Sequence, residues 1–237
     1  MERTDKLCEY LAANVKSPLD VIVIDNGSDL TPPSKYTALR LDENVQTTNG
    51  WLMGLHYADC LARKHNNPYF AYWFIITSAE FVGEGDPLMP MLKCFDHMPH
   101  AVACHPVLTK DSTTSWEHMK GVGNGGYTRT FMVDNIASLY RADWFDSIGR
   151  FDPALTYAWG IDLETCWKAR RDGKTIWLSE SVPVKKVTDI GYTMNRMNQT
   201  ADERRAKAGA QMAEILASRY GVNWWERMNH EYVANIW

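Results

Sequence analysis

The sequence lacks the features that mark secreted, membrane-embedded and nucleic-acid-binding proteins. Its five cysteines are widely spread and include no Cys-x-x-Cys pair, which argues for reduced thiols and against a disulfide framework. No apolar run approaches the ~18 residues of a membrane-spanning helix, and the first ten residues contain no signal-peptide core. The formal net charge of −4 excludes a strongly basic module that binds nucleic acid through its phosphates. These absences predict a cytoplasmic protein with no integral membrane segment and no nucleic-acid partner.

Aromatic residues are the compositional excess, with 10 Trp, 11 Tyr and 7 Phe among 237 residues. Two explanations are open: a large buried core, or platforms on which a sugar ring or a base stacks. The chain is otherwise ordinary, because 45% hydrophobic and 23% charged residues are typical of a globular protein.

Helical and strand-like patterns alternate along the chain. Apolar periodicity and capping residues predict helices over residues 4–15, 51–64, 162–171 and 200–221, the last with a Thr200-x-x-Glu203 capping box. Short apolar runs predict buried strands over residues 21–24, 72–76, 101–104, 136–140 and 175–178. This alternation predicts an α/β fold with a mostly parallel sheet in one domain.

Polar residues follow two of these strands, at positions 25–29 and 77–80. Ligands of open α/β sheets bind beyond the carboxyl ends of the strands, so both clusters are candidate site residues. The last predicted helix carries a stripe of Ala208, Met212, Ile215 and Leu216, which predicts packing on the domain. A contact within a homodimer is the alternative.

Two segments carry a family resemblance. The segment VIVIDNGSD, residues 21–29, resembles the second-strand motif of family 2 glycosyltransferases with the GT-A fold, although a strand followed by an Asx turn gives the same pattern. Residues 148–178 resemble the acceptor-side signature of that family, in which Gly-x-Phe-Asp precedes an acidic pair that opens a helix. The Trp159-Gly160 pair is also similar to the Trp-Gly before the acidic pair of galactosyl- and N-acetylgalactosaminyltransferases.

The resemblance implies a GT-A-like three-layer sandwich, with a nucleotide-binding half over residues 1–110, an acceptor-side half over 111–190 and a C-terminal helix and tail over 191–237. It implies a hexosyltransferase-type reaction, the inverting transfer of a sugar from a nucleotide-sugar donor, expected to be a UDP-sugar, to a hydroxyl of a carbohydrate or lipid-linked acceptor. The implied residues are Asp162 as catalytic base, Asp25, Asn26 and Ser28 on the nucleotide, Ser78, Glu80 and Lys185 near the diphosphate, and Trp159 and Glu164 facing the donor sugar or acceptor. A helix N-terminus stabilises a carboxylate, which suits a base at Asp162, but the same electrostatics also serve helix stability alone.

Three departures from the family pattern matter for activity. Thr77-Ser78-Ala79-Glu80 stands where the family has its Asp-x-Asp metal motif, and Lys185 stands where a late His often contacts the metal. Because a Mg²⁺ or Mn²⁺ site needs carboxylate ligands, we expect metal-independent transfer in which Lys185 or Lys186 replaces the ion; a bound Mn²⁺ or Mg²⁺ is the alternative. The family's opening strand is not recognisable before residue 4. The competing hypothesis is therefore a degenerate domain that binds a nucleotide sugar or a partner without turnover.

Two further constellations have structural explanations beside functional ones. Cys94, His97, His100, Cys104 and His105 are potential zinc ligands, but their spacing matches no standard zinc module and a loop around a short strand explains them too. The glycine-rich residues 121–126 suit either a flap over the site or a plain surface loop.

Overall fold

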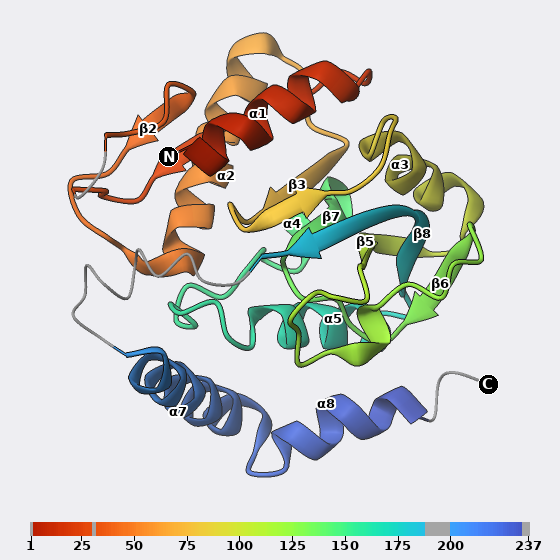
Figure 1. The fold of residues 1–237 in the computed structure, drawn as a ribbon. Helices are drawn as coiled ribbons and strands as arrows, with labels where there is room; N and C mark the ends of the chain where they lie inside the picture. Colours follow the sequence, from red (N-terminus) through yellow and green to blue (C-terminus); the bar gives the residue numbers. More distant parts are fainter. Residues whose placement is uncertain (1, 30–31, 188–199, 234–237) are drawn as a thin grey trace.

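The computed structural model describes residues 2–29, 32–187 and 200–233, and it consists of a central sheet flanked by helices (Figure 1). The order of strands across this sheet is β3 (Ala71–Ile75), β7 (Ala137–Arg141), β5 (Ala101–Leu108), β8 (Thr175–Lys186) and β4 (Ala79–Phe81), with β6 (Tyr127–Thr130) also paired to β8. A separate pair is formed by β1 (Val23–Asp25) and β2 (Thr37–Arg40). The predicted α/β class is confirmed.

The direction of the strands departs from the mostly parallel sheet that the sequence predicts. Among the described strands only β1–β2 and β5–β8 pair in parallel, whereas β3–β7, β5–β7, β4–β8 and β6–β8 are antiparallel. Strands β4 and β6 have three and four residues, too few for apolar periodicity to reveal them. Both lie against β8, which runs eight residues beyond the predicted end at Leu178.

Three strands nevertheless end at one edge of the sheet. Strand β7 is antiparallel to both β3 and β5, and β5 is parallel to β8, so β3, β5 and β8 run in the same direction. Their carboxyl ends therefore lie together with the start of β7. Ligands of open α/β sheets bind beyond the carboxyl ends of the strands, so we call this side of the sheet the ligand edge.

All four predicted helices are present, with shifted ends. They are α1 (Glu2–Asn14), α2 (Gln46–His65), α5 (Ile161–Arg171) and α7 (Ala201–Tyr220). The structure adds α3 (Leu88–His97), α4 (Ala142–Ser147), α8 (Trp224–Val233) and a 3-10 turn at Glu117–Met119. The capping box is formed as predicted: Glu203 N donates to Thr200 Oγ1 at 3.2 Å, and Thr200 N donates to the Glu203 carboxylate at 2.8 Å.

The C-terminal helices pack on the same chain. Figure 1 shows α7 and α8 on the side of the molecule that carries α5, away from α1 and α2. Of the predicted stripe on α7, Ala208 and Leu216 are buried, and Met212 and Ile215 pack against the main core. This confirms the predicted intramolecular packing.

Most of the aromatic excess is core. Phe74, Tyr140, Phe145 and Phe151 form a cluster in which the ring centroids of every pair lie 4.7–6.0 Å apart. Trp167 is also buried, with 2% of its surface exposed. Among the described tryptophans the large exposed surfaces belong to Trp159 and Trp225, at 44% and 46%. The explanation as stacking platforms is thus confined to few residues.

The five cysteines are free thiols, of which only Cys60 is exposed. None of the helices in the described ranges combines the length and apolar character that crossing a bilayer requires.

Candidate functional site

The turn after β3, the segment before β7 and the end of β8 meet at the ligand edge of the sheet. Ile76 N donates to Ile136 O at 3.0 Å, and Val187 N donates to Ser78 O at 2.9 Å. The turn that stands in the position of the metal motif is therefore held between these two segments, with Ser78 at its centre.

Two carboxylates and a lysine gather beside this turn. Lys186 Nζ lies 3.3 Å from Asp134 Oδ2, and both side chains are largely buried, with 29% and 25% exposed. The backbone of Asp134 is fixed, since its N–H donates to Met119 Sδ at 3.2 Å and its carbonyl accepts from Ile136 N at 2.7 Å. Asp162 opens α5, and its Oδ1 accepts from Leu163 N at 2.8 Å.

The environment of Asp162 favours a carboxyl that exchanges a proton near neutral pH. Burial raises the pKa of Asp162 to about 7, and the nearby Asp134 carboxylate contributes in the same direction. The backbone N–H of Leu163 and the charge of Lys186 lower this pKa by smaller amounts. A carboxyl of this kind can accept a proton from a bound hydroxyl without being permanently ionised or permanently neutral.

The two neighbouring lysines of β8 have different surroundings. Lys185 forms an ion pair with Asp111 and stands opposite Glu80 in the β4–β8 ladder. Glu80 is exposed and also accepts from Arg3 Nη1 at 3.1 Å. Because side chains alternate between the faces of a strand, Lys186 is on the other face, where it meets Asp134. Of the two lysines considered from the sequence, Lys186 is the one whose charge acts on Asp162.

The structure brings Asp25 and Ser28 together at the end of β1. Asp25 is 6% exposed; its Oδ1 accepts from Ser28 N at 2.9 Å and its Oδ2 lies 3.5 Å from Arg40 Nε. Arg40 also donates to Ser28 O at 2.7 Å. The side chain of Asn26 instead donates to Gln46 O at 3.0 Å and accepts from Val45 N at 2.9 Å, which ties β1 to the start of α2.

Trp159 and Glu164 do not face the same surroundings. Trp159 is 44% exposed, whereas Glu164 is only 1% exposed. The carboxylate of Glu164 accepts from the hydroxyl of Tyr220, and it lies 3.2 Å from Lys168 Nζ and 3.6 Å from Arg219 Nη1. The carboxylate of Glu164 is therefore buried among partners on α5 and α7, whereas the ring of Trp159 is accessible.

Sequence reasoning missed Asp134 and Asn135. Asn135 is 5% exposed, and its Oδ1 accepts from the Tyr140 hydroxyl at 2.8 Å. Within the described ranges its Nδ2 is a buried donor without a hydrogen-bond partner. The available signal was a polar pair, Asp134-Asn135, that interrupts an apolar run directly before a predicted strand.

The residues present do not fit a metal site. In the part of the chain that the structure describes, no three His, Cys, Asp or Glu side chains are grouped so that they could hold an ion. Of the suspected zinc ligands, Cys94 on α3 and Cys104 on β5 are buried side by side in one core cluster, but no third ligand joins them within the described ranges. His105 is fully buried, and its ring contacts Ala137 N and Pro106 O. For Mn²⁺ or Mg²⁺, the only carboxylate among residues 77–80 is that of Glu80, which pairs with Arg3, and Lys186 pairs with the nearby Asp134.

The glycine-rich loop is anchored to the sheet. Glu180, which sits in an irregular part of β8, accepts from Val122 N at 2.9 Å, Gly123 N at 3.1 Å and Thr128 Oγ1 at 2.8 Å. At the first residue of the loop Gly121 N donates to Leu108 O at 3.0 Å, and at its last residue Gly126 O accepts from Glu180 N at 2.9 Å. These bonds favour the surface-loop explanation over a flap.

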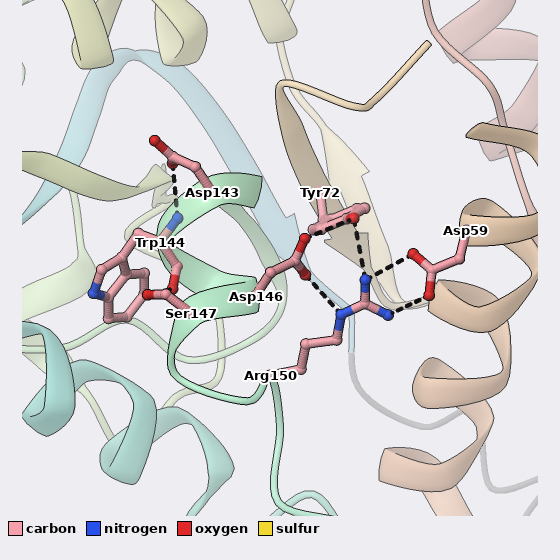
Figure 2. A network of polar contacts seen from close by, with 7 residues as sticks. All are labelled: Asp59, Tyr72, Asp143, Trp144, Asp146, Ser147 and Arg150. Carbon is pink, nitrogen blue, oxygen red and sulfur yellow. Dashed lines mark hydrogen bonds and ion pairs between the residues drawn. The ribbon is translucent and has the colours of Figure 1, made fainter. Parts of the chain in front are cut away.

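A second polar network lies away from this edge (Figure 2). Arg150 donates to both oxygens of Asp59 at 2.7 and 2.8 Å, to Asp146 Oδ1 at 2.7 Å and to the Tyr72 hydroxyl at 3.3 Å. It thereby joins α2, α4 and β3. Beside it, a surface cavity of about 520 Å³ opens at the opposite edge of the sheet, lined by residues that include His100, Arg141, Trp144 and Lys174. None of the residues that the glycosyltransferase resemblance implies lines that cavity.

Comparison with known proteins supports the fold. No protein-family model matches the chain, and no curated protein matches it. Among solved structures, a crystal structure of GalNAc-T7 with UDP, GalNAc and Mn²⁺ is similar, with a TM-score of 0.53 over 80% of this chain at 10% identity. The chain spans 38% of the length of that protein. This likeness confirms the predicted GT-A-like fold.

Proposed function

We propose that the chain is an inverting glycosyltransferase of the family 2 type that moves a sugar from a nucleotide-sugar donor, a UDP-sugar, to a hydroxyl of a carbohydrate or lipid-linked acceptor. The observation that carries the proposal is the arrangement at the carboxyl edge of β3, β5 and β8. There Asp162 opens a helix beside a paired Asp134 and Lys186. The GT-A-like fold and the motif around Trp159-Gly160 support the same reaction class.

In this proposal Asp162 is the general base. Its carboxylate takes the proton of the acceptor hydroxyl while the acceptor oxygen forms a bond to the anomeric carbon. The bond from that carbon to the phosphate oxygen breaks, and its electron pair leaves with the nucleoside diphosphate. The proton then passes from Asp162 to solvent. Attack from the face opposite the leaving group inverts the anomeric configuration.

The binding roles divide between the two clusters. We infer that Asp25 and Ser28 bind the nucleotide, with Asn26 holding that strand end in place, and that Ser78 lies near the diphosphate. Trp159 is the candidate platform for a sugar face because its ring is accessible. Glu80 and Lys185 are weaker candidates, since Arg3 and Asp111 already pair with them.

The competing function is binding of a nucleotide sugar without turnover, favoured by the altered metal motif. Asp162→Asn separates the two functions, with Glu214→Gln on the exposed side of α7 as the matched control. A catalytic Asp162 predicts loss of transfer by roughly 100-fold or more with nucleotide affinity retained. Wild-type protein that binds UDP but turns over no UDP-sugar supports the non-catalytic function.

A thermal-shift screen of UDP, GDP, dTDP and CDP identifies the nucleotide. A ligand that binds the folded state raises Tm by mass action, so the nucleotide that raises Tm most identifies the donor class. If none of the four raises the Tm of the wild-type protein, the proposed function fails.

A further inference from the structure

The proton transfer to Asp162 and the bond changes at the anomeric carbon involve neither Asp134 nor Lys186. These two side chains come from segments far apart in sequence and meet 3.3 Å apart at the ligand edge. Lys186 N also donates to Ser112 Oγ at 3.0 Å, so the backbone that carries the lysine is held to the loop after β5. Hydrogen bonds therefore hold the backbone of both Asp134 and Lys186 in place.

The reaction demands a cation at this edge. Breaking the bond to the leaving group leaves negative charge on the diphosphate, and a positioned cation stabilises that charge. The single carboxylate in the metal-motif position, that of Glu80, is exposed and paired with Arg3, whereas the neighbouring Lys186 supplies an ammonium group with three donors. Asn135 adds a buried amide hydrogen that has no partner in the described ranges.

We propose that Lys186 binds the diphosphate of the donor, and that Asp134 is a positioning residue that holds Lys186 until the donor arrives. This inference rests on the proposed function. Donor binding exchanges one ion pair for another: Lys186 leaves Asp134 and pairs with the diphosphate, and no covalent bond changes.

The exchange couples donor binding to the base. The charged or titratable groups that act on Asp162 or feel its charge are Asp134 before β7, Lys186 on β8, Tyr140 on β7 and Cys166 on its own helix. Once Lys186 pairs with the diphosphate, the Asp134 carboxylate is no longer compensated. Its repulsion then makes Asp162 a stronger base in the donor complex than in the free protein.

The binding test uses calorimetric titration of UDP and of uridine, in EDTA, into wild type and single variants. Lys186→Met should weaken UDP roughly 10–100-fold and leave uridine unchanged, because uridine has no diphosphate. Asp134→Asn should bind UDP roughly 3–10-fold more tightly, since it removes a competitor for Lys186 and a like charge. The control Lys174→Met, at the opposite edge, should bind as wild type.

Three results overturn the inference while the proposed function stands. One is that Lys186→Met binds UDP as tightly as wild type does. Another is that Lys185→Met, and not Lys186→Met, weakens UDP binding. The third is Asp134→Asn that weakens UDP as much as Lys186→Met does. If the screen identifies another nucleotide, its diphosphate and its nucleoside replace UDP and uridine.

The pH profile supplies a readout that a merely structural role does not move. In Asp134→Asn the acid limb of kcat/KM for the acceptor, measured at saturating donor, should move about 0.5–1 unit toward lower pH, because a repulsive charge beside Asp162 is gone. Asp134→Glu should restore the limb. An unchanged limb in Asp134→Asn contradicts the coupling of Asp134 to the base.

Discussion

At the scale of single residues, the titration of Asp162 has consequences for activity. Its pKa of about 7 means that half of the carboxyls are protonated at neutral pH, and only the ionised form can act as a base. We expect kcat/KM to fall tenfold per pH unit below about 7. A profile that is flat from pH 5 to 8 contradicts the assignment of Asp162 as base.

The same titration affects stability with a definite sign. The folded-state pKa of about 7 lies above the ordinary value of 3.8, so the folded state binds the proton more tightly than the unfolded state does. Stability is therefore lost as pH rises from about 4 to 7. Asp162→Asn removes this cost and should raise the free energy of unfolding by on the order of 2 kcal/mol at pH 8. Its advantage over wild type in Tm should be smaller at pH 4.5, and a lower Tm than wild type at pH 8 refutes the idea.

A substitution of Glu164 tests whether this acidic residue in the first turn of α5 stabilises the fold or binds a ligand. Its carboxylate is 1% exposed and shared by Tyr220, Lys168 and Arg219. Glu164→Gln leaves these groups without their charged partner and should cost about 1–3 kcal/mol of unfolding free energy. Nucleotide affinity measured well below Tm should not change. Normal stability with weakened nucleotide or acceptor binding would instead return Glu164 to the ligand site.

At the scale of elements, Arg150 links three segments of the chain. The backbone of Arg150 has a left-handed conformation with φ of 64°, which is uncommon for residues other than glycine and asparagine. The paired bonds to Asp59 and the bond to Asp146 hold it there (Figure 2).

Replacing Arg150 should loosen the contact of α2 with α4 and β3. We expect Arg150→Met to lose about 2–3 kcal/mol in denaturant unfolding, since the part-buried Asp59 and the more exposed Asp146 lose their cation. Arg150→Lys should recover only part of this, because an ammonium group cannot form two parallel bonds. The exposed Arg129→Met is the control. A loss below about 0.5 kcal/mol for Arg150→Met shows that the network does not stabilise the fold.

At the scale of the whole molecule, the charge arrangement predicts the response to metal ions. Lys186 lies at the ligand edge, and the described residues contain no group of carboxylates that could hold a metal ion there. Transfer and nucleotide binding should therefore be unchanged by EDTA and by added Mn²⁺. Activity that is abolished by EDTA and restored by Mn²⁺ would falsify metal-independent transfer.

Much of the fold could be predicted from local pattern. Helices α2, α5 and α7 follow from apolar periodicity and capping, and the Thr200–Glu203 box forms as its sequence indicates. Strands β4 and β6 could not be predicted, because three or four residues carry no periodicity and both depend on pairing with β8.

The candidate site was predictable only in part, for a geometric reason. Sequence indicates that Asp162 and Glu164 both lie in the first turn of a helix. Positions two apart in a helix point about 200° away from each other, so one of them had to face away from the site. Lys185 and Lys186 likewise had to face opposite sides of a strand.

The sequence alone determined the longer strands of the sheet and four of the helices, and that an acidic residue opens α5 beyond the strands. Local backbone preferences and hydrophobic patterning are properties of neighbouring residues and need no partner. Only the tertiary structure decided which acid and which lysine meet. Asp134, Asp162 and Lys186 are separated by more than twenty residues along the chain, and the pairing of β7 and β8 with β5 brings them to one edge. The same holds for the aromatic residues: the composition shows that they are numerous, but only the packing shows that most of them are buried in the core.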